Sequence, residues 1–197
     1  EDIVGHKVVS WRCPRLFGGT HVTNSLEALG YECDATYPMY FYNEQLFPYH
    51  PSQENWTEQG SLNLIEIIQF ADMGMESKDD YGRDKDQWPL YRTQSTEAFI
   101  PHIESFMSYL EENDQSQKPI VLCFYFHPWE FWEMPEGVIH FGEGGVIPDP
   151  FLTKGCGSYC LKQVELLIDW LKSKDASFLT AGQCARKWKN ILAQADL

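Results

Sequence analysis

Two short stretches of the sequence place a charged or titratable side chain where a proline stops a strand. Arg12 lies in Trp11-Arg12-Cys13-Pro14, and His127 lies in Phe126-His127-Pro128-Trp129-Glu130. An arginine there can bind a carboxylate through two parallel hydrogen bonds, and a histidine can donate or accept a proton near pH 7. Together they indicate acid–base chemistry. The structural alternatives are a histidine that caps the strand end and an arginine that pairs with a buried carboxylate.

His127 ends a run of seven apolar residues, Ile120 to Phe126, that follows Pro119. An apolar run without polar alternation predicts a strand buried on both faces, as at the centre of a parallel sheet or barrel. Pro128 removes the next backbone donor, so the chain must leave the sheet and present the imidazole at the carboxyl end of the strand. In α/β folds this is the edge that carries functional residues.

Arg12 belongs to a predicted strand, helix, strand unit. Val8 to Trp11 is strand-like, Thr20 is a plausible N-cap of a short helix, and Gly30 stands just beyond the end of that helix. Tyr31 to Thr36 is the second strand and delivers Asp34 near its end. Units of this kind build parallel sheets.

The rest of the chain continues the alternation of strands and helices. Leu62 to Ile68 is a predicted strand, Pro101 suits the first turn of a helix, and a last helix spans roughly Leu161 to Lys172 before a final strand from Ala176 to Thr180. No internal repeat or linker interrupts this order. The sequence therefore predicts one α/β domain over residues 1–197, with a parallel sheet or barrel.

Three segments lack a helical or strand period. Residues 37–60 are rich in aromatic residues, proline and amides, which predicts a long ordered loop of the kind that lines a binding cleft. Residues 72–88 form a charged insertion, for which a solvated loop and a lid are both open. Residues 132–155 contain His140 and a flexible glycine-rich stretch, and we expect them over the same edge as His127.

The composition is rich in hydrophobic and aromatic residues, as in folded proteins, and acidic residues outnumber basic ones. The 197 residues are 43% hydrophobic and include 15 Lys and Arg against 29 Asp and Glu, a formal net charge of −14. This charge repels phosphate backbones and anionic lipids, so it argues against nucleic-acid and membrane partners. No run approaches the roughly 18 to 20 apolar residues of a membrane helix, and nothing at the start resembles a signal peptide.

The six cysteines are expected to be reduced, because a chain of this size does not need disulfides to fold. Reduced thiols favour a cytoplasmic location, with a secreted or cell-envelope location as the alternative. Cys123 lies in the predicted buried strand, where a small apolar thiol is ordinary. Cys156 and Cys160 could form a local pair or half a metal site, but the sequence has no second Cys/His pair with zinc spacing, which favours ordinary thiols.

Parts of the chain resemble the polysaccharide deacetylase (NodB homology) family. Residues 11–16, Trp-Arg-Cys-Pro-Arg-Leu, resemble its Arg-x-Pro motif, and residues 25–36 resemble the helix and strand that follow it. Residues 124–131, Phe-Tyr-Phe-His-Pro-Trp-Glu-Phe, look like its late histidine motif, and residues 166–180 resemble its closing helix and strand. The resemblance covers nearly the whole chain and depends on the order and spacing of these parts.

The resemblance implies a distorted (β/α) barrel that removes acyl groups, usually acetyl, from the amino sugars of chitin, peptidoglycan or related glycans. In that scheme a divalent metal, zinc or similar, polarises the amide carbonyl and activates a water, an aspartate is the general base, and the late histidine protonates the leaving amine. His127 would be that acid, and Arg12 would hold the base aspartate. The residues implied at the substrate site are Trp129, Asp34, Pro14 and Trp11. For Asp34, a turn residue at a strand end is the equal alternative.

The departure from the family pattern concerns the metal. The family's Asp-Asp pair and His-x-x-x-His pair precede the Arg-x-Pro motif and do not occur in this sequence. We therefore expect the metal ligands and the base outside this chain. The barrel's first strands are also missing, which would expose an open edge that native folds avoid. The expectation is a C-terminal portion of the domain, with the N-terminal half of the same domain as its partner.

Three functions fit these features. The first is a metal-dependent hydrolase acting on an N-acylated glycan or related compound. The second is a non-catalytic relative that binds sugar in an aromatic cleft, with Tyr40, Tyr42, Trp56, Trp88, Trp129 and Trp132. The third is an amide hydrolase of the same barrel acting on a small cyclic or linear amide. Upstream Asp-Asp and His-x-x-x-His motifs would separate the first from the second, and substrate trials would separate the first from the third.

Overall fold

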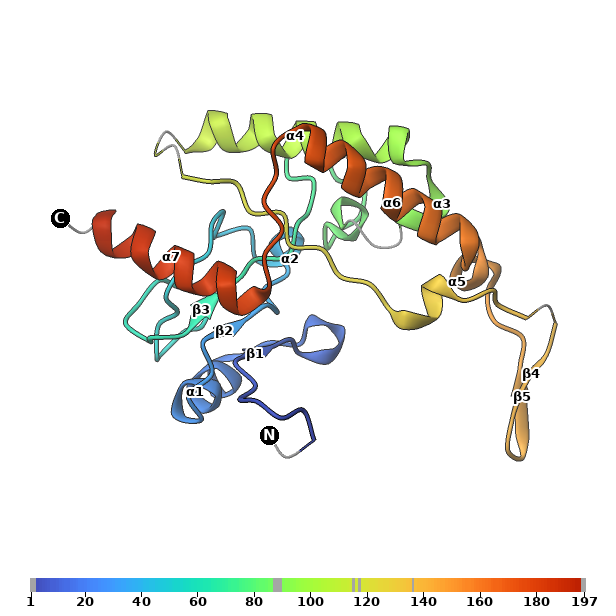
Figure 1. The fold of residues 1–197 in the computed structure, drawn as a ribbon, viewed down its shortest axis with the longest axis horizontal. Coiled ribbons are helices and arrows are strands. Elements are labelled where there is room, and N and C mark those ends of the chain that lie inside the picture. The colour runs from blue at the N-terminus through green and yellow to red at the C-terminus, as the bar shows by residue number, and fades with distance from the viewer. Residues whose placement is uncertain (1–2, 87–89, 115, 117, 136, 196–197) are drawn as a thin grey trace. The chain divides into compact units, whose positions relative to one another are not determined.

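The computed structural model describes residues 3–86, 90–114, 116, 118–135 and 137–195 (Figure 1). It divides into two compact units: residues 1–86, 106–124 and 178–197 form the first, and residues 87–105 and 125–177 form the second. Helix α4 (Thr96–Asn113) contributes its beginning to the second unit and its end to the first. The single domain over residues 1–197 stays a prediction.

The first unit is built on three short parallel strands. They are β1 (Ser10–Trp11), β2 (Cys33–Asp34) and β3 (Ile65–Glu66), in the order β1-β2-β3. The register pairs Trp11 with Asp34 and Asp34 with Glu66. Helix α1 (Thr20–Ala28) connects β1 to β2, which confirms the predicted strand, helix, strand unit.

The ends of α1 follow from its glycines. Gly19 occupies the N-cap position with an extended φ of 171°, so Thr20 is the first helical residue and not the cap. Thr23 is fully buried and its hydroxyl donates to the Thr20 carbonyl, 3.0 Å away. Gly30, with a φ of +73°, adopts the left-handed conformation that commonly follows a helix and turns the chain toward β2.

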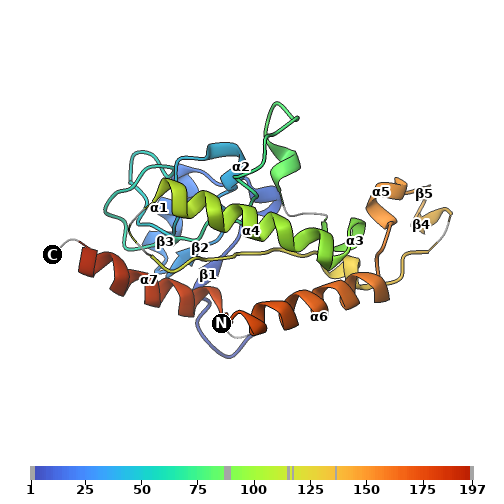
Figure 2. The same ribbon diagram turned by 90° about the horizontal axis from the view of Figure 1, so that it is seen from above.

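Helix α7 (Ala181–Ala195) covers β2 and β3 (Figure 2). Its buried residues are Cys184, Ala185 and Trp188, and the first two each lie about one helical turn from Trp188, so all three share one face. This helix was not expected from the sequence. The spacing of these three residues is the signal that could have found it.

The first unit contains three more short elements. The 3₁₀ helix η1 (Pro14–Leu16) follows β1, helix α2 (Met39–Tyr42) interrupts the predicted aromatic loop, and the 3₁₀ helix η2 (Arg83–Lys85) lies in the charged insertion. A core cluster of Leu26, Leu62 and Leu64 packs α1 against the segment that leads into β3.

The second unit is mainly helical. It contains α3 (Leu90–Thr93), the 3₁₀ helix η3 (Pro128–Phe131), α5 (Pro150–Thr153) and α6 (Ser158–Ser173), and both α3 and η3 contact α6. The strands β4 (Ile139–Phe141) and β5 (Gly144–Val146) form an antiparallel hairpin. Residues 132–155 are therefore more regular than the sequence predicted.

Three sequence predictions are wrong. Residues 120–126 form no strand and are only half-buried. A backbone hydrogen bond from Phe70 N to the Cys123 carbonyl, 3.0 Å long, joins them to the chain after β3. Residues 176–180 are exposed and form no strand. Helix α4 begins at Thr96, so Pro101 lies inside the helix and not in its first turn.

The two sheets, one parallel and one antiparallel, make a mixed α/β arrangement, and the distorted barrel stays a prediction. Within the described residues, every helix is too short or too polar to cross a membrane.

Candidate functional site

Arg12, directly after β1, holds together three segments of the first unit. Its Nε donates to the Ala35 carbonyl (2.9 Å), its Nη1 to the Phe124 carbonyl (3.4 Å) and its Nη2 to Cys123 Sγ (3.2 Å). Ala35 follows β2, and residues 123 and 124 belong to the extended segment before His127. The guanidinium therefore ties the carboxyl ends of β1 and β2 to that segment.

Asp34 is fully buried at the end of β2. Its Oδ1 accepts a hydrogen bond from the Thr36 hydroxyl, which in turn accepts from Cys13 N at 2.9 Å. Burial raises the pKa of Asp34 to about 6, and the Thr36 hydroxyl and the Arg12 charge lower it only in part. Asp34 therefore lies in the protein interior. Its hydrogen bond to Thr36, two residues later, is the kind of contact expected of a turn residue at a strand end.

Glu66 is a second buried carboxyl that the sequence analysis missed. Its Oε1 accepts from Thr36 N (3.1 Å) and Tyr37 N (2.8 Å), and the residue is fully buried beside Asp34. Burial and the Asp34 charge raise the pKa of Glu66 well above its usual range. A lone acidic residue between Ile65 and Ile67 in a predicted apolar strand is the signal that could have found it.

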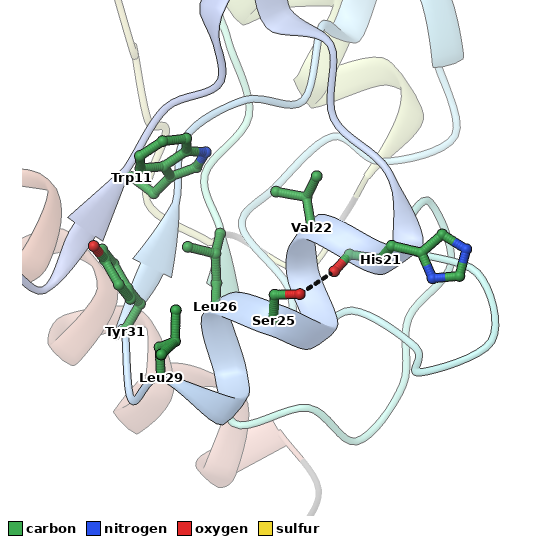
Figure 3. A pocket seen from close by; sticks show the side chains of 7 residues that line it. All are labelled: Trp11, His21, Val22, Ser25, Leu26, Leu29 and Tyr31. Carbon is green, nitrogen blue, oxygen red and sulfur yellow. Dashed lines mark hydrogen bonds between the residues drawn. The ribbon is translucent and has the colours of Figure 1, made fainter.

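Trp11 and Pro14 lie apart from the Arg12 contacts. Trp11 is the last residue of β1. The indole is 39% exposed and lines an open apolar groove of about 410 Å³ with Leu26 and Tyr31 (Figure 3). Pro14 is exposed and begins η1.

His127 occupies the N-cap position of η3 in the second unit. Its Nδ1 lies 3.3 Å from Glu130 Oε1, and its backbone N donates to Glu130 Oε2 at 3.4 Å. The imidazole stacks on the Trp129 indole, with ring centroids 5.4 Å apart and an interplanar angle of 26°. The side chain remains 44% exposed, so a substrate can reach it.

Glu130 forms an ion pair with Arg92, and both side chains are buried. The Arg92 Nε lies 3.6 Å from Glu130 Oε1. Its guanidinium also lies over the Trp129 ring at 5.2 Å and donates to the Phe151 carbonyl. An ionised carboxylate can only accept hydrogen bonds, so a Glu130 carboxylate at this distance requires the proton of the pair to sit on His127 Nδ1.

The predicted aromatic cleft is divided between buried and exposed rings. Trp56 is 5% exposed and packs against Tyr37 and Tyr42, with centroids 5.7 Å and 5.3 Å away, so it belongs to the core. Trp132 is 74% exposed and Tyr40 is half-buried. Trp88 lies outside the described residues.

A divalent metal does not fit the side chains that the structure describes. No group of three His, Cys, Asp or Glu residues among them could hold an ion. Asp34 and Glu66 are two buried carboxyls, one fewer than such a group, and burial disfavours the ionised form that a metal ligand needs. All six cysteines are free thiols, Cys156 and Cys160 included. Metal ligands outside this chain stay a prediction.

Arg12 and Asp34 belong to the first unit, and His127, Trp129 and Glu130 belong to the second. In the second unit His127 and Arg92 both lie against the buried carboxyl of Glu130, and in the first unit the Arg12 charge lowers the pKa of the buried Asp34. The comparisons add no relative: no protein-family model, curated protein or solved structure matches the chain.

Proposed function

We propose that the protein is a hydrolase that removes N-acyl groups, usually acetyl, from an amino-sugar glycan, with His127 as the general acid. The observation that carries this proposal is the His127 turn, in which an accessible imidazole has Nδ1 on the buried carboxylate of Glu130. The proposal places the metal ligands and the base aspartate outside this chain, so no step is assigned to a metal here.

His127 suits the last step of amide hydrolysis, in which the C–N bond breaks and the amine leaves with a proton. The doubly protonated imidazole donates from Nε2 and keeps the proton on Nδ1, which Glu130 continues to accept. The ion pair with Arg92 holds Glu130 in place, and the Trp129 stack fixes the plane of the ring. The half-buried Trp129 would then contact the sugar at the edge of the ring pair.

Arg12 keeps its proposed role as the residue that orients a base aspartate. Its bond to the Phe124 carbonyl is long, 3.4 Å, and a carboxylate would be a stronger partner for that Nη1. Trp11 and Pro14 are surface residues and stay candidates for substrate contact. Asp34 stays a third candidate, which would require the edge around Thr36 to open.

The experiment is acetate release from a panel of N-acetylated sugars by the complete protein, together with metal analysis. The His127→Ala variant should lose turnover about 100-fold or more with unchanged metal content, consistent with loss of a general acid. His140→Ala is the matched control, because His140 lies on the exposed hairpin strand β4. Retained activity in His127→Ala would defeat the assignment.

A sugar-binding relative without activity is the second candidate. The exposed Trp132 favours it, because an exposed aromatic ring offers an apolar face for a ligand to stack on. Sugar binding without metal or acetate release would support this candidate, and metal without acetate release would point to a small-molecule amide as the substrate. The six free thiols lead us to propose a cytoplasmic setting.

A further inference from the structure

Asp34 and Glu66 are neighbours on the adjacent strands β2 and β3 in the interior of the first unit. The register of β2 and β3 pairs the two residues directly, and both are fully buried. Side chains paired in this way project from the same face of a sheet, on strands about 4.8 Å apart. Two full negative charges at such a distance, without water, repel strongly.

One oxygen of each carboxyl has donors and the other has none. Asp34 Oδ1 is bonded to the Thr36 hydroxyl, and Glu66 Oε1 accepts from Thr36 N and Tyr37 N. Asp34 Oδ2 and Glu66 Oε2 are buried and have no hydrogen-bond donor among the described residues. A buried carboxylate oxygen without a donor is costly, and a proton between the two oxygens would satisfy both.

We infer that Asp34 and Glu66 share one proton, between Oδ2 and Oε2, and that the pair carries a single negative charge at neutral pH. Glu66 is the member that keeps the proton. The Arg12 charge acts on Asp34 and favours its ionised form, whereas the Asp34 charge disfavours ionisation of Glu66. The role of the pair does not depend on acyl hydrolysis.

Other titratable groups surround the pair on every packed element, and none of them supplies a donor to the two open oxygens among the residues described. Besides Arg12 they are Tyr37, Glu44 and Tyr49 from the loop after β2, and the thiols Cys13, Cys33, Cys123 and, on α7, Cys184. Glu66 and Asp34 raise the pKa of Tyr49, and Glu66 raises that of Tyr37 beyond the effect of burial, so these phenols stay neutral when the pair ionises.

The shared proton holds the carboxyl ends of the three strands together. Glu66 on β3 binds the backbone N–H groups of residues 36 and 37 after β2, and the Thr36 hydroxyl connects Asp34 to Cys13 N after β1. Loss of the proton at high pH would leave two adjacent carboxylates and separate these segments. The pair is therefore a pH-sensitive device at the edge that carries Arg12.

Infrared spectroscopy of the full chain at pH 7 tests the inference, because a protonated carboxyl has a carbonyl stretch that a carboxylate lacks. The wild type should show this band, and Glu66→Gln should lose it, since the new amide donates to Asp34 and lets it ionise. Glu104→Gln, an exposed control on α4, should keep the band.

Absence of the band from the wild type, or its persistence in Glu66→Gln, would overturn the inference. If Glu66→Gln does not fold, the wild type decides alone by titration. A carboxyl band that persists at pH 7 and disappears only at higher pH supports the shared proton. A carboxyl band that has disappeared completely by pH 5 contradicts it.

Discussion

The stability of the protein should fall as the pH rises from about 4 to about 6, because Asp34 gains a proton on folding. Its pKa is raised from 3.8 to about 6, so the folded state binds a proton that the unfolded state has released. This stabilisation is fully present below the unfolded value and is lost as the pH rises through the folded value. A shift of about 2 units corresponds to about 3 kcal/mol.

Glu66 acts in the same direction at higher pH. Its pKa is raised well above the ordinary value, so its ionisation continues to lower the free energy of unfolding after Asp34 has lost its proton. Glu66→Gln removes this group but keeps a carbonyl oxygen for Tyr37 N and adds an N–H donor toward Asp34. The variant should therefore have a flatter pH profile than the wild type.

Urea denaturation at pH 4.5, 6 and 7.5 measures the effect, with tryptophan fluorescence as the signal because Trp56 and Trp188 are buried. The wild type should lose stability across this range relative to Glu66→Gln, at an unchanged m-value. Glu104→Gln should follow the wild type. Parallel profiles for the wild type and Glu66→Gln would refute the reasoning, since they would show that Glu66 binds no extra proton in the folded state.

The remaining predictions concern the His127 turn and the core. His127→Ala should lower acetate release about 100-fold or more while His140→Ala leaves it unchanged. Glu130→Ala should lower the free energy of unfolding by about 3–5 kcal/mol, as measured by urea denaturation, because it removes one partner of a buried ion pair with Arg92. Trp188→Ala should cost about 3–5 kcal/mol in the same assay, because it empties a buried site between α7 and the strands.

Local sequence signals predicted the strand, helix, strand unit of the first unit better than the conformation of residues 120–126. Gly30 and the apolar spacing of α1 are sufficient to define the strand, helix, strand unit from Ser10 to Asp34, because each depends on neighbouring residues. The apolar run before His127 indicates burial but not a pairing partner, and a strand exists only where a ladder forms. Residues 120–126 are therefore half-buried and form no β-strand.

The candidate site shows the same division. The sequence predicts His127 and its exposure at a proline, but the role of Glu130 follows from its place three residues later, where a 3₁₀ turn returns its carboxylate to the imidazole. Glu66 is marked in the sequence as a lone acid in an apolar run, but neither its partners nor those of Arg92 could be assigned from neighbouring residues. Their partners come from other elements, and only the fold brings the buried charges together.

This division determines which substitution tests the chemistry. The His127 turn is made by residues 127–130, with Pro128 fixing its first backbone angle, so a change of the imidazole leaves the turn's backbone in place. Arg12 instead bonds to Ala35, Cys123 and Phe124, which are 23, 111 and 112 residues away. Loss of Arg12 would disturb three segments as well as any aspartate that it orients. Under the proposed function, lower acetate release by Arg12→Ala would therefore be ambiguous, whereas lower release by His127→Ala with unchanged stability would identify a missing proton donor.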